Sequence, residues 1–452
     1  MRKLVLIGLA QALLLLAGCG GGGSGSVITP GNNGGGGGQT SNTTAITVDE
    51  GPSALTQQGH ADADTPFITV TLCAPGSTTN CQQIDHVEVD TGSYGLRVIS
   101  PVLTASVASA LQMETASGGN PVLECTQFAD GFSWGPIEVA DVQIAGETAH
   151  SVPIQVMGDS RFENEIPTAC STTGTEEDTV VTFGANAILG LGPFADDCGS
   201  GCATNASNTF YYTCPTNGTS GSNCAGIVVP ESEQTTDPVV YFQTDNNGVI
   251  VELASATEGA DTSSGTLIFG IDTESNNALS AKTLLTANPA DGFITTTYTP
   301  MGGQEQFLPF SYFDTGSNAY YFADSSIPSG TGCAAYQGYN SSNPASWFCP
   351  ASELNDLSAT NTGQNGTQST VTFSIGNAYT LFNQYPGGSV FGDLGASTGP
   401  EPSDCSSQAL AIQDQDYACS FDFGFPFFLG RNVYVAFAGA NTSGGMGPYF
   451  AY

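Results

Sequence analysis

The chain has 452 residues with 42 Asp and Glu against 6 Lys and Arg, so its formal net charge at pH 7 is −36. This charge excludes nucleic-acid binding, because contacts to phosphates need clustered Lys and Arg side chains. The length usually corresponds to more than one domain. Beyond residue 19 the remaining basic residues are Arg97, Arg161, Lys282 and Arg431.

Residues 1–19 are predicted to be a lipoprotein signal peptide. A basic start and an apolar run lead to a lipobox, LAGC, that ends at Cys19. The apolar run is shorter than the about 20 residues of a membrane-spanning helix, and an ordinary cleaved secretory signal is the other alternative. We expect lipid attachment at Cys19. Gly20 resembles the default that sends bacterial lipoproteins to the outer membrane, and whether they face the periplasm or the surface stays open.

Residues 20–43 are rich in Gly, Ser and Asn and are predicted to form a flexible tether with a reach of ~25–30 Å. No later segment has 18 uninterrupted apolar residues. We therefore expect the membrane to be contacted only through the lipid anchor.

From about residue 45 onward, short runs alternate apolar and polar residues, which is the period of a half-buried β-strand. The turn residues Asn246-Asn247-Gly248 predict a hairpin between strands at 241–243 and 249–251. Helical periodicity is scarce and is best over residues 103–113. The other strands predicted most clearly lie at 67–72, 137–139, 142–144 and 152–156.

Apart from Cys19 the chain has twelve cysteines, an even number that favours up to six disulfides in an oxidising compartment. Neighbours in sequence are the first candidates, and a Cys125–Cys170 pair is a further possibility. No pairing is assigned within the group Cys198, Cys202, Cys214 and Cys224. A metal site there is disfavoured by the spacing and by the lack of a nearby histidine. The candidate neighbour pairs are Cys73 with Cys81, Cys333 with Cys349, and Cys405 with Cys419.

The most informative feature is a tetrapeptide, Asp-Thr-Gly-Ser, that occurs at 90–93 and again at 314–317. Each copy follows an apolar or aromatic stretch. Further along, 187–192 (AILGLG) and 427–432 (FFLGRN) each place glycine after bulky apolar residues, and glycine admits close backbone approach. Each half therefore reads as an acidic turn, a variable β region and an apolar-Gly strand, which predicts two related lobes with a cleft between them.

These motifs resemble the pepsin-like aspartic endopeptidase superfamily over most of residues 60–452. The segment 90–100 (DTGSYGLRVIS) is similar to the family's first active-site loop, and 264–273 (SGTLIFGIDT) to the start of its second lobe. The chain is similar to bacterial lipoproteins that carry the same motifs. The resemblance implies an all-β, bilobal pepsin-like fold with an N-terminal lobe at 44–260 and a C-terminal lobe at 261–452.

The resemblance also implies a mechanism. Two aspartates held close together share a proton and titrate as a unit; the family prototype is the standard worked case of this behaviour. The ionised member would activate a water lying between Asp90 and Asp314, and the protonated member would polarise the scissile carbonyl. No cofactor or metal is required, the substrate would be a peptide or protein, and we expect a monomer.

Neighbouring residues would support the dyad. By resemblance, the threonine hydroxyls would lock each loop to the opposite backbone, the glycines would expose N–H groups, and the serines would bond the outer carboxylate oxygens. These supporting residues are Thr91, Gly92, Ser93, Thr315, Gly316 and Ser317.

A flap over the cleft is expected at 125–144, with Phe128, Gly131 and Trp134 near its tip. The family's flap tyrosine falls on Phe128, and the tryptophan that partners it falls on Arg97, so both members of that pair are absent. Trp134 is a possible substitute, and ordinary hairpin packing is the alternative for Phe128 and Trp134.

Two other functions compete with the peptidase. Gly131-Phe132-Ser133-Trp134-Gly135 matches the serine-hydrolase motif, but the β pattern around it lacks the strand-to-helix turn that the motif needs. The stronger rival is an inactive protein of the same fold that binds a peptide, glycan or partner protein in its cleft. The altered flap and the lack of a basic propeptide favour this rival, whereas the two intact motifs favour the enzyme. Substrate preference and pH optimum cannot be read from the sequence.

Overall fold

The computed structural model describes residues 42–452 apart from 60, 216–222, 341–344, 403–404 and 406–418. The predicted signal peptide, Cys19 and nearly all of the predicted tether lie outside the described residues. The last residue assigned to the tether, Thr43, already begins the first strand. In the described part of the chain no helix has the length and apolar character of a membrane span.

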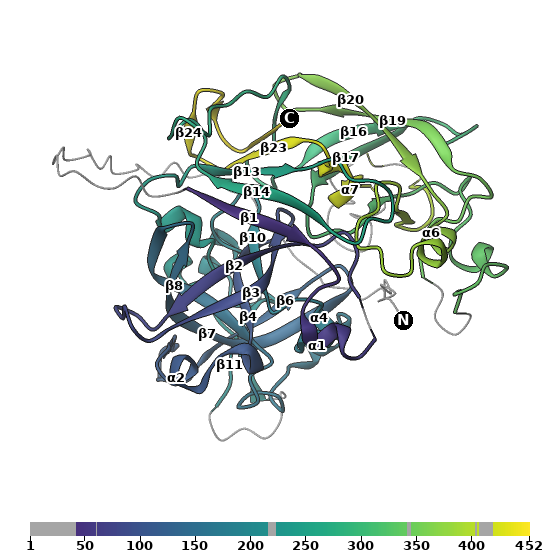
Figure 1. The fold of residues 1–452 in the computed structure, drawn as a ribbon. Coiled ribbons are helices and arrows are strands. Elements are labelled where there is room, and N and C mark those ends of the chain that lie inside the picture. Colours follow the sequence, from purple (N-terminus) through teal and green to yellow (C-terminus); the bar gives the residue numbers. More distant parts are fainter. Residues whose placement is uncertain (1–41, 60, 216–222, 341–344, 403–404, 406–418) are drawn as a thin grey trace.

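The regular structure of the described chain is mainly β, in one large and one smaller sheet (Figure 1). The larger sheet joins seventeen strands of the described chain. They are β1 (Thr43–Val48), β2 (Pro66–Cys73), β3 (Cys81–Asp90), β4 (Tyr94–Ile99), β5 (Gln112–Met113), β6 (Val122–Gln127), β7 (Gly131–Ile144), β8 (Glu147–Met157), β9 (Thr175–Glu176), β10 (Ala187–Leu191), β11 (Tyr211–Thr213), β12 (Ala225–Gly226), β13 (Gly248–Leu253), β14 (Ser263–Phe269), β15 (Leu284–Thr286), β23 (Asn432–Ala436) and β26 (Tyr449–Ala451).

The second sheet belongs to the C-terminal lobe, and short helices lie between the strands. Its seven strands are β16 (Ile294–Tyr298), β17 (Gln306–Phe313), β18 (Tyr320–Phe322), β19 (Leu354–Thr362), β20 (Gln368–Ile375), β21 (Gly395–Ser397) and β22 (Asp422–Phe423), and β24 (Asn441–Thr442) pairs with β25 (Gly445–Met446) alone. The α-helices are α1 (Ser53–Thr56), α2 (Ala105–Ala108), α3 (Thr168–Ser171), α4 (Val180–Phe183), α5 (Ser200–Thr204), α6 (Ala378–Gln384) and α7 (Phe425–Phe428). The 3₁₀ helices are η1 (Ser100–Val102), η3 (Glu231–Glu233), η4 (Pro238–Tyr241) and η5 (Gly330–Cys333).

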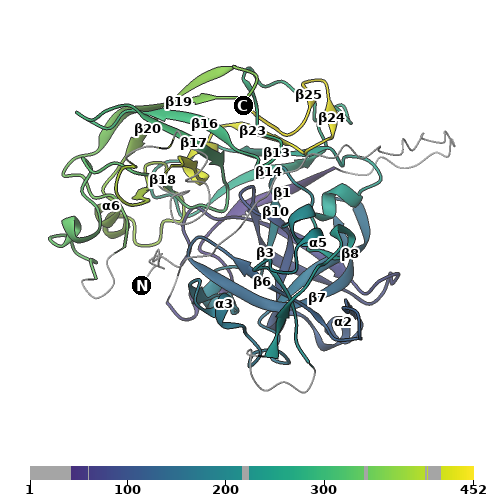
Figure 2. The same ribbon diagram turned by 180° about the vertical axis from the view of Figure 1, so that it is seen from behind.

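The two lobes are joined by a layer of strands taken from both ends of the chain. β1 pairs with β14 over six residues, β13 pairs with both β14 and β23, and β23 pairs with β26. Figure 1 shows β1, β13, β14 and β23 between the N-terminal lobe and the C-terminal lobe, and Figure 2 shows the same layer from behind. The predicted fold class, all-β with two lobes and a cleft between them, is confirmed.

Several local predictions also hold. Residues 67–72 lie in β2, 137–139 and 142–144 lie in β7, and 152–156 lie in β8. The alternation is clearest in β2, where Ile68, Val70 and Leu72 are all buried and Thr69 is exposed, whereas most of β7 is buried on both faces.

Two predictions of local structure are wrong. Residues 241–243 are no strand, because η4 begins at Pro238, where proline suits the first helical turn, and the Asp237 side chain caps it by accepting from Val239 N. The helix expected over 103–113 shrinks to α2. The last two residues of the expected helix, Gln112 and Met113, instead form strand β5, which pairs with β7.

Six disulfides cross-link the fold. The four predicted pairs are confirmed, and the unassigned group resolves into Cys198–Cys202 and Cys214–Cys224, so none of those four thiols is free to bind a metal. The four predicted pairs are Cys73–Cys81, Cys125–Cys170, Cys333–Cys349 and Cys405–Cys419.

Candidate active site

The first acidic turn connects strands β3 and β4, and both strands pair with the same third strand, β10. β3 ends at Asp90, and β10 runs parallel to β3, with Gly190 opposite Asp90. β10 also runs antiparallel to β4, the strand that follows the turn. Because one strand fills the space between both arms of the loop, the turn at 90–93 is held rigidly.

The second acidic turn has the same construction, but with a strand that the sequence analysis did not identify. β22 runs parallel to β17, with Phe313 opposite Phe423, and antiparallel to β18. The N–H of Asp314 donates to the carbonyl of Phe423 at 3.1 Å. The strand under this turn is therefore β22, within the sequence FDFG at 421–424.

The assignment of that role to 427–432 is wrong. Phe427 and Phe428 lie in α7, and the next strand, β23, begins at Asn432. Two sequences that place glycine after apolar residues follow each other here, FDFG at 421–424 and FFLG at 427–430. The first was not recognised as the buried strand because it carries an acidic residue, Asp422, at a core position.

We call β10 and β22 the inserted strands, because each lies between the two arms of an acidic turn. Glycine is required within β10 and directly after β22. A Cβ atom on Gly190 would lie 2.4 Å from the backbone nitrogen of Tyr94, and one on Gly424 would lie 2.0 Å from the carbonyl oxygen of Ala319. In each half the chain that leaves the acidic turn thus passes directly over a glycine. The sequence predicted this role for Gly190, whereas in the second half Gly424 has the role that was expected within 427–432.

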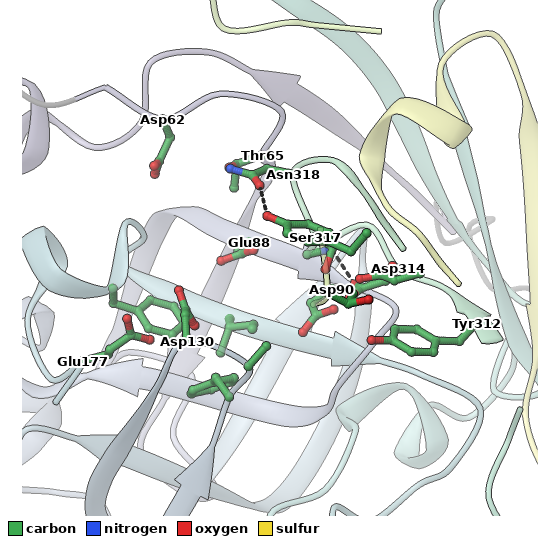
Figure 3. Close-up of a pocket in the computed structure, with 18 of the residues that line it drawn as sticks. Asp62, Thr65, Glu88, Asp90, Asp130, Glu177, Tyr312, Asp314, Ser317 and Asn318 are labelled. Atoms are coloured by element: carbon green, nitrogen blue, oxygen red, sulfur yellow. Dashed lines mark hydrogen bonds between the residues drawn. The ribbon is translucent and has the colours of Figure 1, made fainter. Parts of the chain in front are cut away.

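The two acidic turns face each other at close range. A Cβ on Gly92 would lie 2.4 Å from the carboxyl carbon of Asp314, and one on Gly316 would lie 2.6 Å from the carboxyl carbon of Asp90. Each carboxyl group therefore packs against the glycine of the opposite turn. Asp90 is 6% and Asp314 is 9% exposed. Figure 3 shows the two side chains together at one end of a cavity.

The threonines bind the two turns together reciprocally. The Thr91 hydroxyl donates to the carbonyl of Phe313 at 2.9 Å and accepts from Thr315 N at 3.1 Å. The Thr315 hydroxyl donates to the carbonyl of Val89 at 2.6 Å and accepts from Thr91 N at 3.1 Å. The arrangement matches the one that the resemblance implied for these residues.

The glycines of the two turns make equivalent hydrogen bonds to the aspartates, whereas the serines do not. Gly92 N donates to Asp90 Oδ1 at 2.7 Å, and Gly316 N donates to Asp314 Oδ1 at 2.8 Å. Ser317 hydrogen-bonds to the Asp314 carboxyl. The Ser93 hydroxyl is buried without a hydrogen-bond partner among the described residues, so the role implied for it is not seen.

The electrostatics of the site are asymmetric. Burial raises the pKa of Asp314 well above its usual range, and the charges of Asp90 and Asp422 raise it further. Burial also raises the pKa of Asp422, and the charge of Asp90 adds to this shift. Asp314 therefore holds its proton more readily than an ordinary carboxyl group. Asp422 is the third carboxyl of the site, and the sequence analysis missed it.

The flap is a hairpin of β6 and β7 with its turn at 128–130. Gln127 pairs with Phe132, and Phe128 N donates to the carbonyl of Gly131 at 2.8 Å. Phe128 lines the cleft, and its ring lies 5.6 Å from that of Phe183.

Trp134 does not contact the cleft. It is 1% exposed, and its indole N–H donates to the carbonyl of Phe162 at 3.2 Å inside a core cluster with Cys125 and Tyr212. Its suggested role as a substitute at the flap tip is therefore wrong, and the packing alternative holds. Gly131 serves packing too, because a Cβ there would lie 2.4 Å from the carbonyl oxygen of Thr175.

Arg97 anchors the base of the flap through a buried ion-pair network. It is 2% exposed, and its guanidinium donates to Glu124 Oε1 at 2.8 Å and to Asp197 Oδ2 at 3.1 Å. Burial would raise the pKa of Glu124, but the Arg97 charge holds it below its usual range. Because Glu124 lies in β6, the network joins the flap strand to β4.

The serine-hydrolase hypothesis is wrong. Residues 131–135 lie inside β7 rather than at a strand-to-helix turn, and Ser133 is fully buried. Its hydroxyl donates to the carbonyl of Glu177 at 3.2 Å. No described histidine reaches it, since His86 and His150 contact aspartates elsewhere.

Two adjoining cavities flank the dyad. The larger, of about 1020 Å³, is lined by residues of both lobes, including Asp90, Tyr94, Asp291 and Asp314. The smaller, of about 200 Å³, lies under the flap (Figure 3). Together they form a cleft that passes across both carboxyl groups.

Because several carboxyl groups are buried, we expect the free energy of unfolding to be highest in mild acid. Burial raises the pKa of Asp178 to about 7 and that of Glu258 to about 7. A carboxyl whose pKa is higher in the folded state stabilises the fold below its unfolded pKa, and this contribution is lost as the pH rises through the folded pKa. Between about pH 4 and pH 7 we expect the free energy of unfolding to fall by about 1.4 kcal/mol per pH unit for each such group. Below this window, the lowered pKa of Asp141 reverses the trend.

Thermal denaturation at pH 4.5 and pH 7.5 checks this expectation. Asp178→Asn keeps an acceptor for Trp134 N, which now donates to Asp178 Oδ1 at 3.0 Å, and it should reduce the difference in melting temperature between the two pH values. A melting temperature that rises steadily from pH 4.5 to pH 7.5 would contradict the prediction.

Comparison with known proteins places the chain in a family. No curated protein matches it. Among solved structures, an aspartic proteinase from Irpex lacteus is similar at a TM-score of 0.44 and 15% sequence identity, over 87% of this chain and 94% of that one. A family model described as "Protein of unknown function (DUF3443)" matches residues 38–452. Because that match spans both lobes and both acidic turns, the chain belongs to this family.

Proposed function

We propose that the protein is an aspartic endopeptidase that hydrolyses peptide bonds with a water activated between Asp90 and Asp314. The observation that carries the proposal is the reciprocal packing of the two carboxyls: each lies against the glycine of the opposite turn, at the floor of a cleft between the lobes. A pair of buried acids in this relation can hold one proton between them and divide the roles of base and acid.

The burial of Asp314 beside Asp90 and Asp422, which raises its pKa, supports the following division of those roles. Asp90 takes a proton from the water as its oxygen attacks the peptide carbonyl carbon, while protonated Asp314 donates its proton to the carbonyl oxygen. A tetrahedral diol results. Asp90 then passes its proton to the leaving amine, the C–N bond breaks, and Asp314 recovers a proton from the diol. The acid and the amine leave, and the dyad returns to its singly protonated state.

The reciprocal threonine bonds support this mechanism by fixing the distance between the carboxyls. Preorganised groups lower the barrier because they need no rearrangement during the reaction. Ser317 hydrogen-bonds to both Asp314 and Asp422 and lowers the pKa of each, so it positions these carboxyls without deciding which group holds the proton.

A second candidate is an inactive cleft that binds a peptide, glycan or partner protein. The observation that favours it is the flap, where Phe128 carries no hydroxyl and Arg97 is committed to Glu124 and Asp197. The two candidates differ in whether a peptide bond is broken.

We propose that the protein is held at the cell envelope by a lipid on Cys19, through the Gly-rich segment that follows it. A soluble form for enzymology should begin before Asn42, because its side-chain amide donates to the carbonyl of Phe269 at 2.9 Å. Residues 20–452 meet this requirement.

Cleavage of a mixed peptide library across pH 3 to 7 tests the proposed activity. We expect cleavage that is strongest in acid, that pepstatin inhibits, and that Asp90→Asn abolishes. Cleavage that survives Asp90→Asn would mean that another group does the chemistry. An absence of cleavage by protein with intact disulfides would favour the binding candidate.

A further inference from the structure

The smaller cavity beside the dyad has an unusual chemical lining. It measures about 200 Å³ and reaches from Asp90 and Asp314 to the underside of the flap. Its walls combine aromatic rings with carboxyl groups, and none of the described residues that line it is Lys, Arg or His. Besides the dyad, the acidic residues are Asp62, Glu88, Asp130, Glu177 and Asp422.

These acids come from several separate elements. Asp130 lies at the flap turn, and Glu177 packs against the start of β7, where a Cβ on Gly131 would lie 2.6 Å from its Cγ. Glu88 lies in β3, two residues before Asp90. Figure 3 shows Asp130 and Glu177 at the end of the cavity away from Asp314, with Glu88 between them and the dyad. The negative charge thus extends along the whole cavity.

The arginines of the described chain are engaged elsewhere, so none of them neutralises this lining. Arg97 contacts Glu124 and Asp197, and Arg161 contacts Glu138 at 2.7 Å. The guanidinium of Arg431 lies 4.6 Å from the ring centre of Phe427. A cationic group of a ligand would therefore meet carboxyl groups in this cavity without competition from an arginine of the described chain.

A buried polar atom in the cavity floor also lacks a partner. Asp422 is 4% exposed and lines the cavity, and its Oδ1 has no hydrogen-bond partner among the described residues. In the first lobe the equivalent position, two residues before the glycine of the inserted strand, is Ile188. An apolar residue would pack there at no desolvation cost, whereas an unpartnered carboxyl oxygen is costly unless a ligand contacts it.

The aromatic rings narrow the kind of cation. Phe128, Phe183 and Tyr321 line the same space, and aromatic faces attract ammonium and guanidinium groups while also accepting a hydrocarbon stem. Within the described residues, no three His, Cys, Asp or Glu side chains are grouped as metal ligands. An elongated organic cation therefore suits the cavity better than a metal ion.

We propose that this cavity receives a lysine or arginine side chain of the substrate, next to the bond that is cleaved. The inference rests on the proposed peptidase function for its geometry, since the cavity shares Asp90 and Asp314 with the dyad. Carboxylates would bind the charged head through charge-assisted hydrogen bonds, and the rings would cover the stem. An apolar side chain would desolvate the same carboxylates with no compensating bond, and an acidic one would be repelled.

The test uses the full-length protein in detergent and peptides that differ only at the residue next to the cleaved bond. We expect kcat/KM for the lysine or arginine peptide to exceed that for norleucine by about tenfold or more, with glutamate lowest. Glu177→Gln should reduce the lysine-to-norleucine ratio by about tenfold, and Asp130→Asn, at the half-buried flap turn, should act in the same direction. Glu305→Gln removes one charge from an exposed position outside the cavity and should leave the ratio unchanged.

A binding measurement separates this inference from the proposed chemistry. Pentylamine should bind the full-length protein more tightly than pentanol, and Glu177→Gln should weaken that binding. If peptides are cleaved with equal efficiency whatever their charge, the inference is overturned and the peptidase stands. If no peptide is cleaved but pentylamine binds in a Glu177-dependent way, the cation site stands and the peptidase fails. If neither cleavage nor binding is found, both are overturned.

Discussion

Replacing either dyad aspartate with asparagine is expected to lower kcat/KM by about a thousandfold or more, the range seen when a group that transfers a proton is removed. Asparagine keeps the size and the acceptor oxygen of aspartate, so the bonds from Gly92 N and Gly316 N can persist. Because the two carboxyls act as a unit, the double variant, Asp90→Asn with Asp314→Asn, should be no less active than the worse single variant.

Asp314→Asn should not lose stability. Burial and the neighbouring charges of Asp90 and Asp422 disfavour ionised Asp314, so a neutral amide at this position should not destabilise the fold. We expect the melting temperature of this variant at pH 7 to equal or exceed that of the parent protein. This trade between stability and activity is common at active sites. A variant that loses both activity and stability would show that Asp314 serves the fold and would leave its catalytic role unsupported.

Gly92→Ala and Gly316→Ala are expected to lower kcat/KM by about a hundredfold each while the protein stays folded. The added Cβ would lie 2.4 Å and 2.6 Å from the carboxyl carbon of the opposite aspartate, so that carboxyl must move. A displacement of about 1 Å at a reacting group costs roughly this factor. Steady-state kinetics on the peptide series measure the effect, and it should appear in kcat more than in KM.

Gly387→Ala is the matched control, because its new methyl would find its nearest neighbour, Asp261 Oδ1, at 3.8 Å, an ordinary contact. It should change neither kcat nor KM. Full activity in Gly92→Ala would mean that the two carboxyls need not be held at the observed distance, which would count against a shared proton.

The features that the sequence predicted are those set by local patterns. Strand alternation located β2, because Thr69 is exposed between buried neighbours, and it located parts of β7 and β8, although most of β7 is buried on both faces. The repeated tetrapeptide located both acidic turns, because two identical copies of Asp-Thr-Gly-Ser are not expected by chance in one chain. Disulfides between near neighbours were found by their spacing, and Cys73–Cys81 closes the hairpin of β2 and β3 at paired positions.

The features that the sequence did not predict depend on contacts between distant segments. The cavity acids lie far apart in the sequence, so no window of sequence shows that Glu88, Asp130 and Glu177 line one space. The strand under the second turn was misassigned because Asp422 breaks the apolar pattern that should have marked it. Trp134 looked like a tip residue, yet the pleat of β7 turns it inward to Phe162.

The inserted strands β10 and β22 also differ in a way that gives the dyad a direction. An ideal twofold pair of acids would leave its shared proton without a preferred owner until a substrate arrived. Here Ile188 stands in one half and Asp422 in the other, and the charge of Asp422 raises the pKa of Asp314. In the proposed mechanism this difference favours the proton on Asp314, on the C-terminal side. The two lobes would then have the same architecture but different roles, and a peptide substrate would meet a base on Asp90 and an acid on Asp314.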